Sequence, residues 1–253
     1  MLRSADRPRA PRARVGAPYL VPLALALVAA VALWLGWGRI AAIGSRVLES
    51  PQAQVRKALL HQDRAQLDDV YGFHSGGTAE LAPVRFGDVA LGFDGDRALV
   101  TARVEADGRI AWRDDAAAVS YLGLERFTMT PCPIALWCAD GRQFTNLRGV
   151  LTALFRRVDA FRARDAGAYA RLVADDYQGP GGKPALLARL RADLGDGPPA
   201  TLHVRAWQIR VERARAIVGE DYEVRAGDGA PARLRARFEL VREGDRWVFA
   251  AGL

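Results

Sequence analysis

The sequence is poor in the residues that most metal, thiol and phosphate chemistry requires. It contains two cysteines and three histidines among 253 residues. The histidines, His61, His74 and His203, are scattered and lack the spacing of metal ligands. The glycine-rich segments 76–77 and 179–182 lack the spacing of a phosphate-binding loop. We therefore expect neither a metal nor a cofactor.

Lysine is also scarce, since Lys57 and Lys183 are the only lysines among 36 basic residues. Much of the formal net charge of +7 comes from the arginines of residues 1–14, so we expect no nucleic-acid partner. With 50% hydrophobic and 26% charged residues, the composition excludes a wholly disordered or collagen-like chain. The length is enough for one large domain or two small ones.

One long apolar run stands out against this ordinary composition. Residues 15–38 contain no charged side chain, and this length is enough to cross the hydrocarbon core of a bilayer as a helix. Five arginines precede the run, whereas only Arg39 and Arg46 follow it closely. The positive-inside rule then places the N-terminus in the cytoplasm and the bulk of the chain outside the inner membrane of a bacterial-type cell.

A cleaved signal peptide is the alternative to this single membrane span. The basic start, the apolar run and the small residues Ala41, Ala42 and Gly44 all suit one. However, the run is longer than a secretory apolar region, and the small residues come after Arg39. We therefore favour an uncleaved anchor, and both interpretations export the remainder.

Two stretches of alternating apolar residues match each other at a constant spacing of 118 residues. They consist of Val84, Phe86, Val89, Leu91 and Phe93, and of Leu202, Val204, Trp207, Ile209 and Val211. The alternation slips by one residue at the same point in both, which predicts a β-bulge in each strand. Further along, residues 125–129 resemble residues 245–249, and both are predicted to form closing strands.

An amphipathic helix is predicted before each strand set. In the second unit, apolar residues recur at helical steps at Val150, Leu151, Leu154, Val158, Phe161, Tyr169, Leu172 and Val173. In the first unit, the corresponding face consists of Val55, Leu59, Leu60, Leu67, Val70 and Tyr71. A short extra helix is expected at residues 183–191 of the second unit, with Pro184 in its first turn.

This order of a long helix, a short helix, a bulged strand and a meander resembles the nuclear transport factor 2-like (NTF2-like), or SnoaL-like, fold. In the second unit the resemblance rests on Phe161, Asp165, Leu172, residues 175–177, residues 181–182 and residues 246–248. The first unit lacks the short helix and is closer to a cystatin-like fold. The resemblance implies an α+β protein in which each long helix packs on a curved, bulged antiparallel sheet.

The expected organisation has five segments. These are a basic cytoplasmic tail (1–14), a transmembrane helix (15–38), a linker (39–51), a first cystatin-like or NTF2-like domain (52–144) and a second NTF2-like domain (149–253).

The two cysteines, Cys132 and Cys138, lie close together in one short segment of the exported part. An even number of cysteines in an oxidising compartment favours a disulfide, with a pair of buried thiols as the alternative. We expect the bond, which would close off the first domain.

Asp176 and Tyr177, with Asp175 before them, are the weak candidates for catalysis. We expect these three to end the long helix of the second unit, near the mouth of the cone in which enzymes resembling this fold often place acid and base groups. His203 is expected to begin the next strand. A buried carboxylate can exchange protons with a substrate because burial raises its pKa. The alternative is that the aspartates only make local turn hydrogen bonds.

Trp207, Phe238 and Trp247 are candidates for lining a ligand pocket in the second domain, although their positions on the inward face of strands also suit ordinary core packing. We favour a membrane-anchored envelope protein that binds a protein partner or a small apolar ligand without catalysis. The alternative is a SnoaL-like isomerase, cyclase or hydrolase that uses the second pocket. The sequence does not indicate an oligomeric state.

Overall fold

The computed structural model describes residues 49–67, 77–112, 115–133, 137–140, 143–195, 200–227 and 229–253. In chain order their elements are α2 (Pro51–His61), β1 (Ala65–Leu67), β2 (Thr78–Asp94), β3 (Arg97–Trp112), β4 (Asp115–Pro131), β5 (Trp137–Asp140), α3 (Thr145–Arg162), α4 (Ala166–Ala170), β6 (Val173–Gln178), α5 (Gly182–Gly195), β7 (Ala200–Glu212), β8 (Arg215–Ala226), β9 (Ala232–Glu243) and β10 (Arg246–Ala251). The expected α+β class is confirmed.

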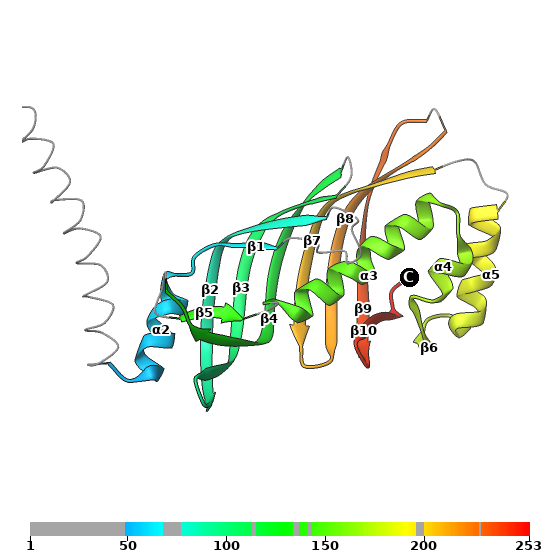
Figure 1. Cartoon of the computed structure of the whole chain (residues 1–253). Helices are drawn as coiled ribbons and strands as arrows, with labels where there is room; N and C mark the ends of the chain where they lie inside the picture. Colours follow the sequence, from blue (N-terminus) through cyan, green and yellow to red (C-terminus); the bar gives the residue numbers. More distant parts are fainter. Residues whose placement is uncertain are drawn as a thin grey trace, which may run out of the picture. The chain divides into compact units, whose positions relative to one another are not determined.

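The described strands form one mixed, ten-stranded sheet. Its order is β1-β2-β3-β4-β7-β8-β9-β10-β6, with β5 paired to β4. The β4–β7 and β10–β6 pairs are parallel, and the other neighbours are antiparallel. Figure 1 shows α3 crossing one face of this curved sheet, with α2 near β2 and β5.

Both predicted bulges are present. The β2–β3 register shifts between Gly87 and Ala90, and the β7–β8 register shifts between Val204 and Ala206. The 118-residue spacing also extends to the pairing itself, because Leu91 lies opposite Val100 and Ile209 lies opposite Val218. The duplication of one fold unit stays a prediction.

The predicted match between residues 125–129 and 245–249 is wrong. Val100 pairs with Phe127 of β4, and Val218 pairs with Phe238 of β9. By position in the sheet, β4 therefore corresponds to β9, and the match with the start of β10 reflects composition alone.

The long helix predicted through Val173 ends earlier. Helix α3 stops at Arg162, Arg164 adopts a left-handed backbone conformation, and the Asp165 side chain accepts a hydrogen bond from the Ala168 N–H at the start of α4. This local cap begins a new helix in a new direction. Tyr169 consequently lies in α4, and Val173 begins strand β6.

The first predicted helix is also shorter than expected. Val55 and Leu59 of α2 are buried, but Leu60 is 80% exposed because it lies about 100° around the helix from Leu59. Leu67 is buried in strand β1 rather than in a helix, where it pairs with Ala79. The predicted contributions of residues 70 and 71 lie outside the described residues.

The predicted short helix at residues 183–191 is confirmed as α5. It begins at Gly182, places Pro184 in its first turn and ends at Gly195. Leu186 and Leu194 are its buried residues.

One apolar cluster connects the residues assigned to the two predicted domains. It contains Ile110 of β3, Leu154 of α3 and Trp207 of β7. Helix α3 packs against β4, β7 and β10, and residues Pro51–Leu253 form one compact unit. The predicted boundary at residues 144–149 thus coincides with the start of α3, while the sheet and the core continue across it.

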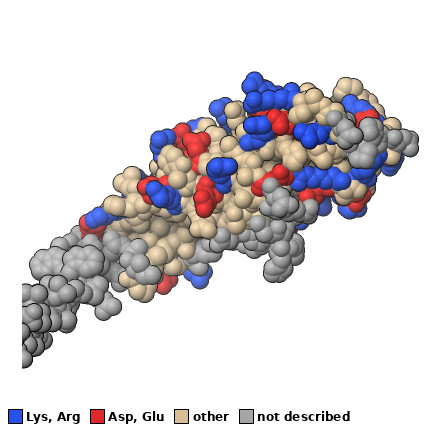
Figure 2. All heavy atoms as spheres, turned by 90° about the horizontal axis from the view of Figure 1, so that it is seen from above, with Lys and Arg blue, Asp and Glu red and all other residues tan. Residues whose placement is uncertain are grey.

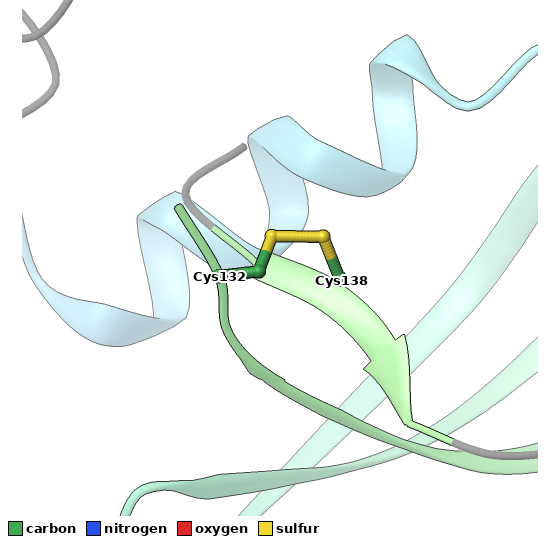
Figure 3. The surroundings of a disulfide bond; sticks show 2 residues. All are labelled: Cys132 and Cys138. Atoms are coloured by element: carbon green, nitrogen blue, oxygen red, sulfur yellow. A yellow bond between two sulfur atoms is a disulfide. The ribbon is translucent and has the colours of Figure 1, made fainter. Parts of the chain in front are cut away.

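The predicted disulfide joins Cys132 to Cys138, with their Cα atoms 5.8 Å apart. Figure 3 shows the bond where the chain leaves β4 and enters β5, beside α2. It therefore closes the turn between two paired strands.

The predicted membrane span, residues 15–38, lies outside the described residues. Within the described part of the chain, no helix is both long enough and apolar enough to cross a bilayer.

Candidate functional site

The acidic candidates for catalysis lie on strand β6 and not at the end of a helix. Asp175 and Asp176 are exposed. The Lys183 ammonium lies 2.7 Å from an Asp175 carboxylate oxygen, and its hydrogen bond and charge hold the pKa of Asp175 below its ordinary value. The expectation that these residues end the long helix was wrong, because the chain breaks at Arg164 before it reaches them.

Tyr177 is buried, and its hydroxyl forms hydrogen bonds with the backbone of Leu253. The hydroxyl donates to the Leu253 carbonyl and accepts from the Leu253 N–H, both at 2.8 Å. This side chain therefore ties β6 to the C-terminal residue.

His203 occupies an exposed position on β7, which three other strands separate from β6 in the sheet order. Its Nδ1 lies 3.1 Å from an Asp115 carboxylate oxygen, and Arg162 pairs with the other oxygen of the same carboxylate. Burial by itself raises the pKa of Asp115, but the hydrogen bonds and charges of Arg162 and His203 outweigh it and lower the pKa. The structure therefore joins His203 to Asp115 and does not bring it together with Asp176.

The three aromatic candidates for ligand contact are packed inside. Trp207, Phe238 and Trp247 are 1%, 3% and 4% exposed. The Trp207 ring lies 5.4 Å from that of Trp112 and 5.3 Å from that of Phe155, measured between centroids. Aromatic side chains therefore fill the interior that an open cone would offer to a ligand.

A buried ion pair lies within this interior, where only apolar strand residues were expected. Arg157 of α3 contacts both carboxylate oxygens of Glu220 on β8 at 2.5 Å, and the Trp207 indole N–H donates to one of them at 2.7 Å. The guanidinium also lies 4.6 Å from the centroid of the Phe238 ring. Burial alone lowers the pKa of Arg157, but the Glu220 charge outweighs it and raises the pKa.

Sequence reasoning missed this pair, although a signal was present. Ala216, Val218 and Glu220 follow a two-residue alternation, so the phase of β8 places Glu220 on the same face as its buried neighbours. Arg157 follows Leu154 by three residues on the apolar face of α3. Three donated hydrogen bonds occupy the Glu220 carboxylate in a nearly dry site, so the pair is suited to holding α3 on the sheet rather than to acid–base turnover.

A second buried carboxylate, Glu125 of β4, caps the start of α3. It accepts hydrogen bonds from the Leu147 N–H (2.9 Å), the Asn146 N–H (3.1 Å) and the Tyr121 hydroxyl (2.6 Å). Burial raises the pKa of Glu125, and these donors act in the opposite direction. Phe144, the residue before α3, offers no side-chain cap, so a distant strand supplies the missing acceptor.

Several other charged side chains form ion pairs on the surface. Arg233 pairs with Asp221 at 2.6 Å, and Arg205 pairs with Glu223 at 2.6 Å. Figure 2 shows basic and acidic side chains interspersed on the face it presents. Among the described residues, no three His, Cys, Asp or Glu side chains gather as metal ligands would.

Comparisons with known proteins give only partial similarities. No protein-family model matches the chain, and a search of curated proteins found no match. Among solved structures, an NTF2-like protein of unknown function from Pseudomonas putida shares 19% identity over 41% of this chain and 80% of its own, with a TM-score of 0.37.

Two further structures show a similar degree of likeness. A protein of unknown function with a cystatin-like fold from Nostoc punctiforme shares 15% identity over 41% of this chain and 85% of its own, with a TM-score of 0.36. A candidate scytalone dehydratase from Novosphingobium aromaticivorans shares 18% identity over 43% and 83%, with a TM-score of 0.37. Each similarity covers less than half of this chain.

Proposed function

We propose that this chain is a single-pass inner-membrane protein that presents residues 51–253 on the exported side as a non-catalytic module, which binds an envelope protein or a small ligand. One observation carries the non-catalytic part. The interior that an NTF2-like enzyme would use is occupied by Trp207, Phe238 and the Arg157–Glu220 pair.

The positions of the acid–base candidates support the same conclusion. A general acid or base must reach its substrate within a site that excludes water and fixes its protonation. Asp176 and His203 instead lie on exposed positions of two strands separated by three others. The alternative of a SnoaL-like isomerase, cyclase or hydrolase would need an open interior that unites such groups.

Export and anchoring are supported by the sequence and by the disulfide. The uncharged run 15–38 and the five arginines before it suit one span with the N-terminus inside. A disulfide between Cys132 and Cys138 is typical of an oxidising compartment.

Complementation of a deletion strain tests the non-catalytic role. Asp176→Asn and His203→Ala should restore function fully, because neither residue lies in a reactive site. Trp207→Ala should lose ~3–5 kcal/mol of stability and fail through unfolding, which immunoblots would show as low abundance. A normally abundant but inactive Asp176→Asn protein would point to the enzyme alternative.

Protease treatment of spheroplasts tests the topology. Digestion should remove the chain after Arg46 and spare the N-terminal tail. A soluble periplasmic form beginning near Ser45 would contradict the anchor.

A further inference from the structure

A cleft of about 670 Å³ lies between α3, α4 and the start of β10. Its lining on α3 includes Gly149, Ala153, Arg156 and Ala160, of which the two alanines are buried. Helix α4 and the start of β10 form the other walls. The cleft therefore borders the main apolar cluster, to which Ala153, Leu172 and Trp247 belong, and its size is that of a small-molecule site.

Gly149 gives the cleft access to a buried donor. A Cβ atom at this position would lie 2.5 Å from Cδ1 and 2.7 Å from Nε1 of Trp247, so only glycine leaves room for the edge of that indole. Trp247 is 4% exposed, and no hydrogen bond joins its Nε1 to another described residue. This Nε1 is not among the fully buried atoms without a partner, so it reaches the cleft, where an acceptor of a ligand can receive its hydrogen bond.

Three arginines surround the same space from three different elements. Arg156 belongs to α3, Arg171 directly follows α4, and Arg246 begins β10. Within the described part of the chain, none of the three guanidinium groups has an ion-pair or hydrogen-bond partner. The lining therefore contains several guanidinium donors that the protein does not use.

Two of the three acidic side chains of the lining already interact with other groups of the protein. The Asp165 carboxylate caps α4 through the Ala168 N–H, and Asp159 has an interaction of its own, although its Oδ1 is buried without a hydrogen-bond partner among the described residues. Asp245 is the remaining acidic residue of the lining, and it is exposed. The lining thus contains three arginines and three aspartates, so its formal charges balance, and the donors that it leaves to a ligand are the three guanidinium groups.

We propose that this cleft binds an amphiphilic organic anion, a compact apolar body that carries one carboxylate or phosphate group. The arginines and the Trp247 N–H hold the anionic head, since guanidinium groups form charge-assisted hydrogen bonds with both head groups. Ala153, Ala160 and Leu172 contact the apolar body. The inference rests on the proposed function in one respect: a non-catalytic module would bind the anion without converting it to a product.

Fluorine NMR titration of the full chain in phosphatidylcholine nanodiscs tests this assignment. The probes are trifluoromethylbenzoate, trifluoromethylphenyl phosphate, and the matched neutral benzyl alcohol and cationic benzylammonium. One or both anions should bind at least about tenfold more tightly than the alcohol, because the alcohol lacks charge-assisted hydrogen bonds. The two anionic probes distinguish a carboxylate head from a phosphate head.

Variants locate the binding. Arg156→Gln and Arg246→Gln should each weaken binding of the anion about tenfold, and Trp247→Phe, which keeps an aromatic ring, about threefold. Arg126→Gln is the matched control, since Arg126 is an exposed arginine of β4 outside the cleft. Circular dichroism would confirm that each variant is folded.

The proposal is overturned if the alcohol or the ammonium probe binds as tightly as both anions. It is also overturned if neither anion binds in the millimolar range. The same holds if the Arg156 and Arg246 variants bind the anion as tightly as the parent protein does. Slow conversion of a bound probe to a new fluorine signal would contradict the non-catalytic role while it supports the site. Failure of Asp176→Asn to complement would likewise count against that role alone.

Discussion

Two buried glutamates occupy related places in the sheet. Glu125 of β4 lies opposite Ala102, and Glu220 of β8 lies opposite Ala236. On its other side Glu220 lies opposite Trp207 of β7, whose indole N–H donates to its carboxylate. Glu125 caps the start of the helix, and Glu220 binds Arg157 near its middle. Single polar residues therefore determine how this helix lies on the sheet.

Removal of the Glu220 charge should be costly. Glu220→Gln leaves Arg157, which is 5% exposed, without a counter-charge, and should lower the free energy of unfolding by ~3–5 kcal/mol. The double substitution Arg157→Met with Glu220→Met should lose much less, because both charges disappear together. Guanidinium denaturation of the full chain in a neutral detergent measures both. Equal losses in the single and double variants would show that the pair is not coupled.

The Asp115 cluster should make stability depend on acid pH. Because Arg162 and His203 lower the pKa of Asp115 in the folded state, its contribution is complete above the pKa of the unfolded chain and is lost as the pH falls through the folded pKa. Stability should therefore fall below about pH 4, near the ordinary aspartate pKa, and Asp115→Asn should flatten this part of the profile. Denaturation midpoints between neutral and acid pH provide the check, with exposed Asp176→Asn as the control.

At the scale of an element, α3 depends on β4 for its first turn. Glu125→Gln removes the charge and replaces one acceptor oxygen by a donor that faces the Asn146 and Leu147 N–H groups. The loss should be ~1–3 kcal/mol, and hydrogen exchange of the Leu147 amide should become faster. Tyr121→Phe removes only one donor and should cost less. Unchanged exchange at Leu147 in Glu125→Gln would exclude the capping role.

At the scale of the whole molecule, the parallel β4–β7 pair makes one sheet of the two strand sets. Its register runs from Ala118 opposite Ala206 to Gly123 opposite Val211. Helix α3 covers both sides of this junction, since its cluster contains residues from β3 and β4 as well as from β7 to β10. The main cluster therefore joins both strand sets, although the first set also has a smaller cluster of its own between α2 and strands β3, β4 and β5.

Residues 51–253 should therefore unfold in one transition. Ile110→Ala in β3, at a site with no exposed surface, should lower stability by ~2–5 kcal/mol and increase hydrogen exchange equally in β8 and β9. Two separate transitions, with β8 and β9 unaffected, would instead favour independent domains at 52–144 and 149–253.

Local chemistry made some features readable from the sequence alone. The alternation of β2 and β7, with its slip, depends only on which side chains face the core, so both bulges were predictable. Pro184 and Gly195 delimit α5, and the close spacing of Cys132 and Cys138 permits one short disulfide. The candidate aromatic residues were found, but their role as packing was left open.

Only the tertiary structure determined the features that depend on contacts between residues distant in the chain. The helical pattern continues past Arg164, and only the packing of α4 and β6 shows where it is broken. The alternation of β4 and β7 is the same whether these strands are edges or neighbours, so their parallel pairing is absent from any local pattern. Charged side chains at apolar positions, such as Arg157 and Glu220, become stable only when the fold brings the opposite charge to them. The sequence by itself determined the faces of the strands, and the three-dimensional pairing determined which faces, charges and clefts meet.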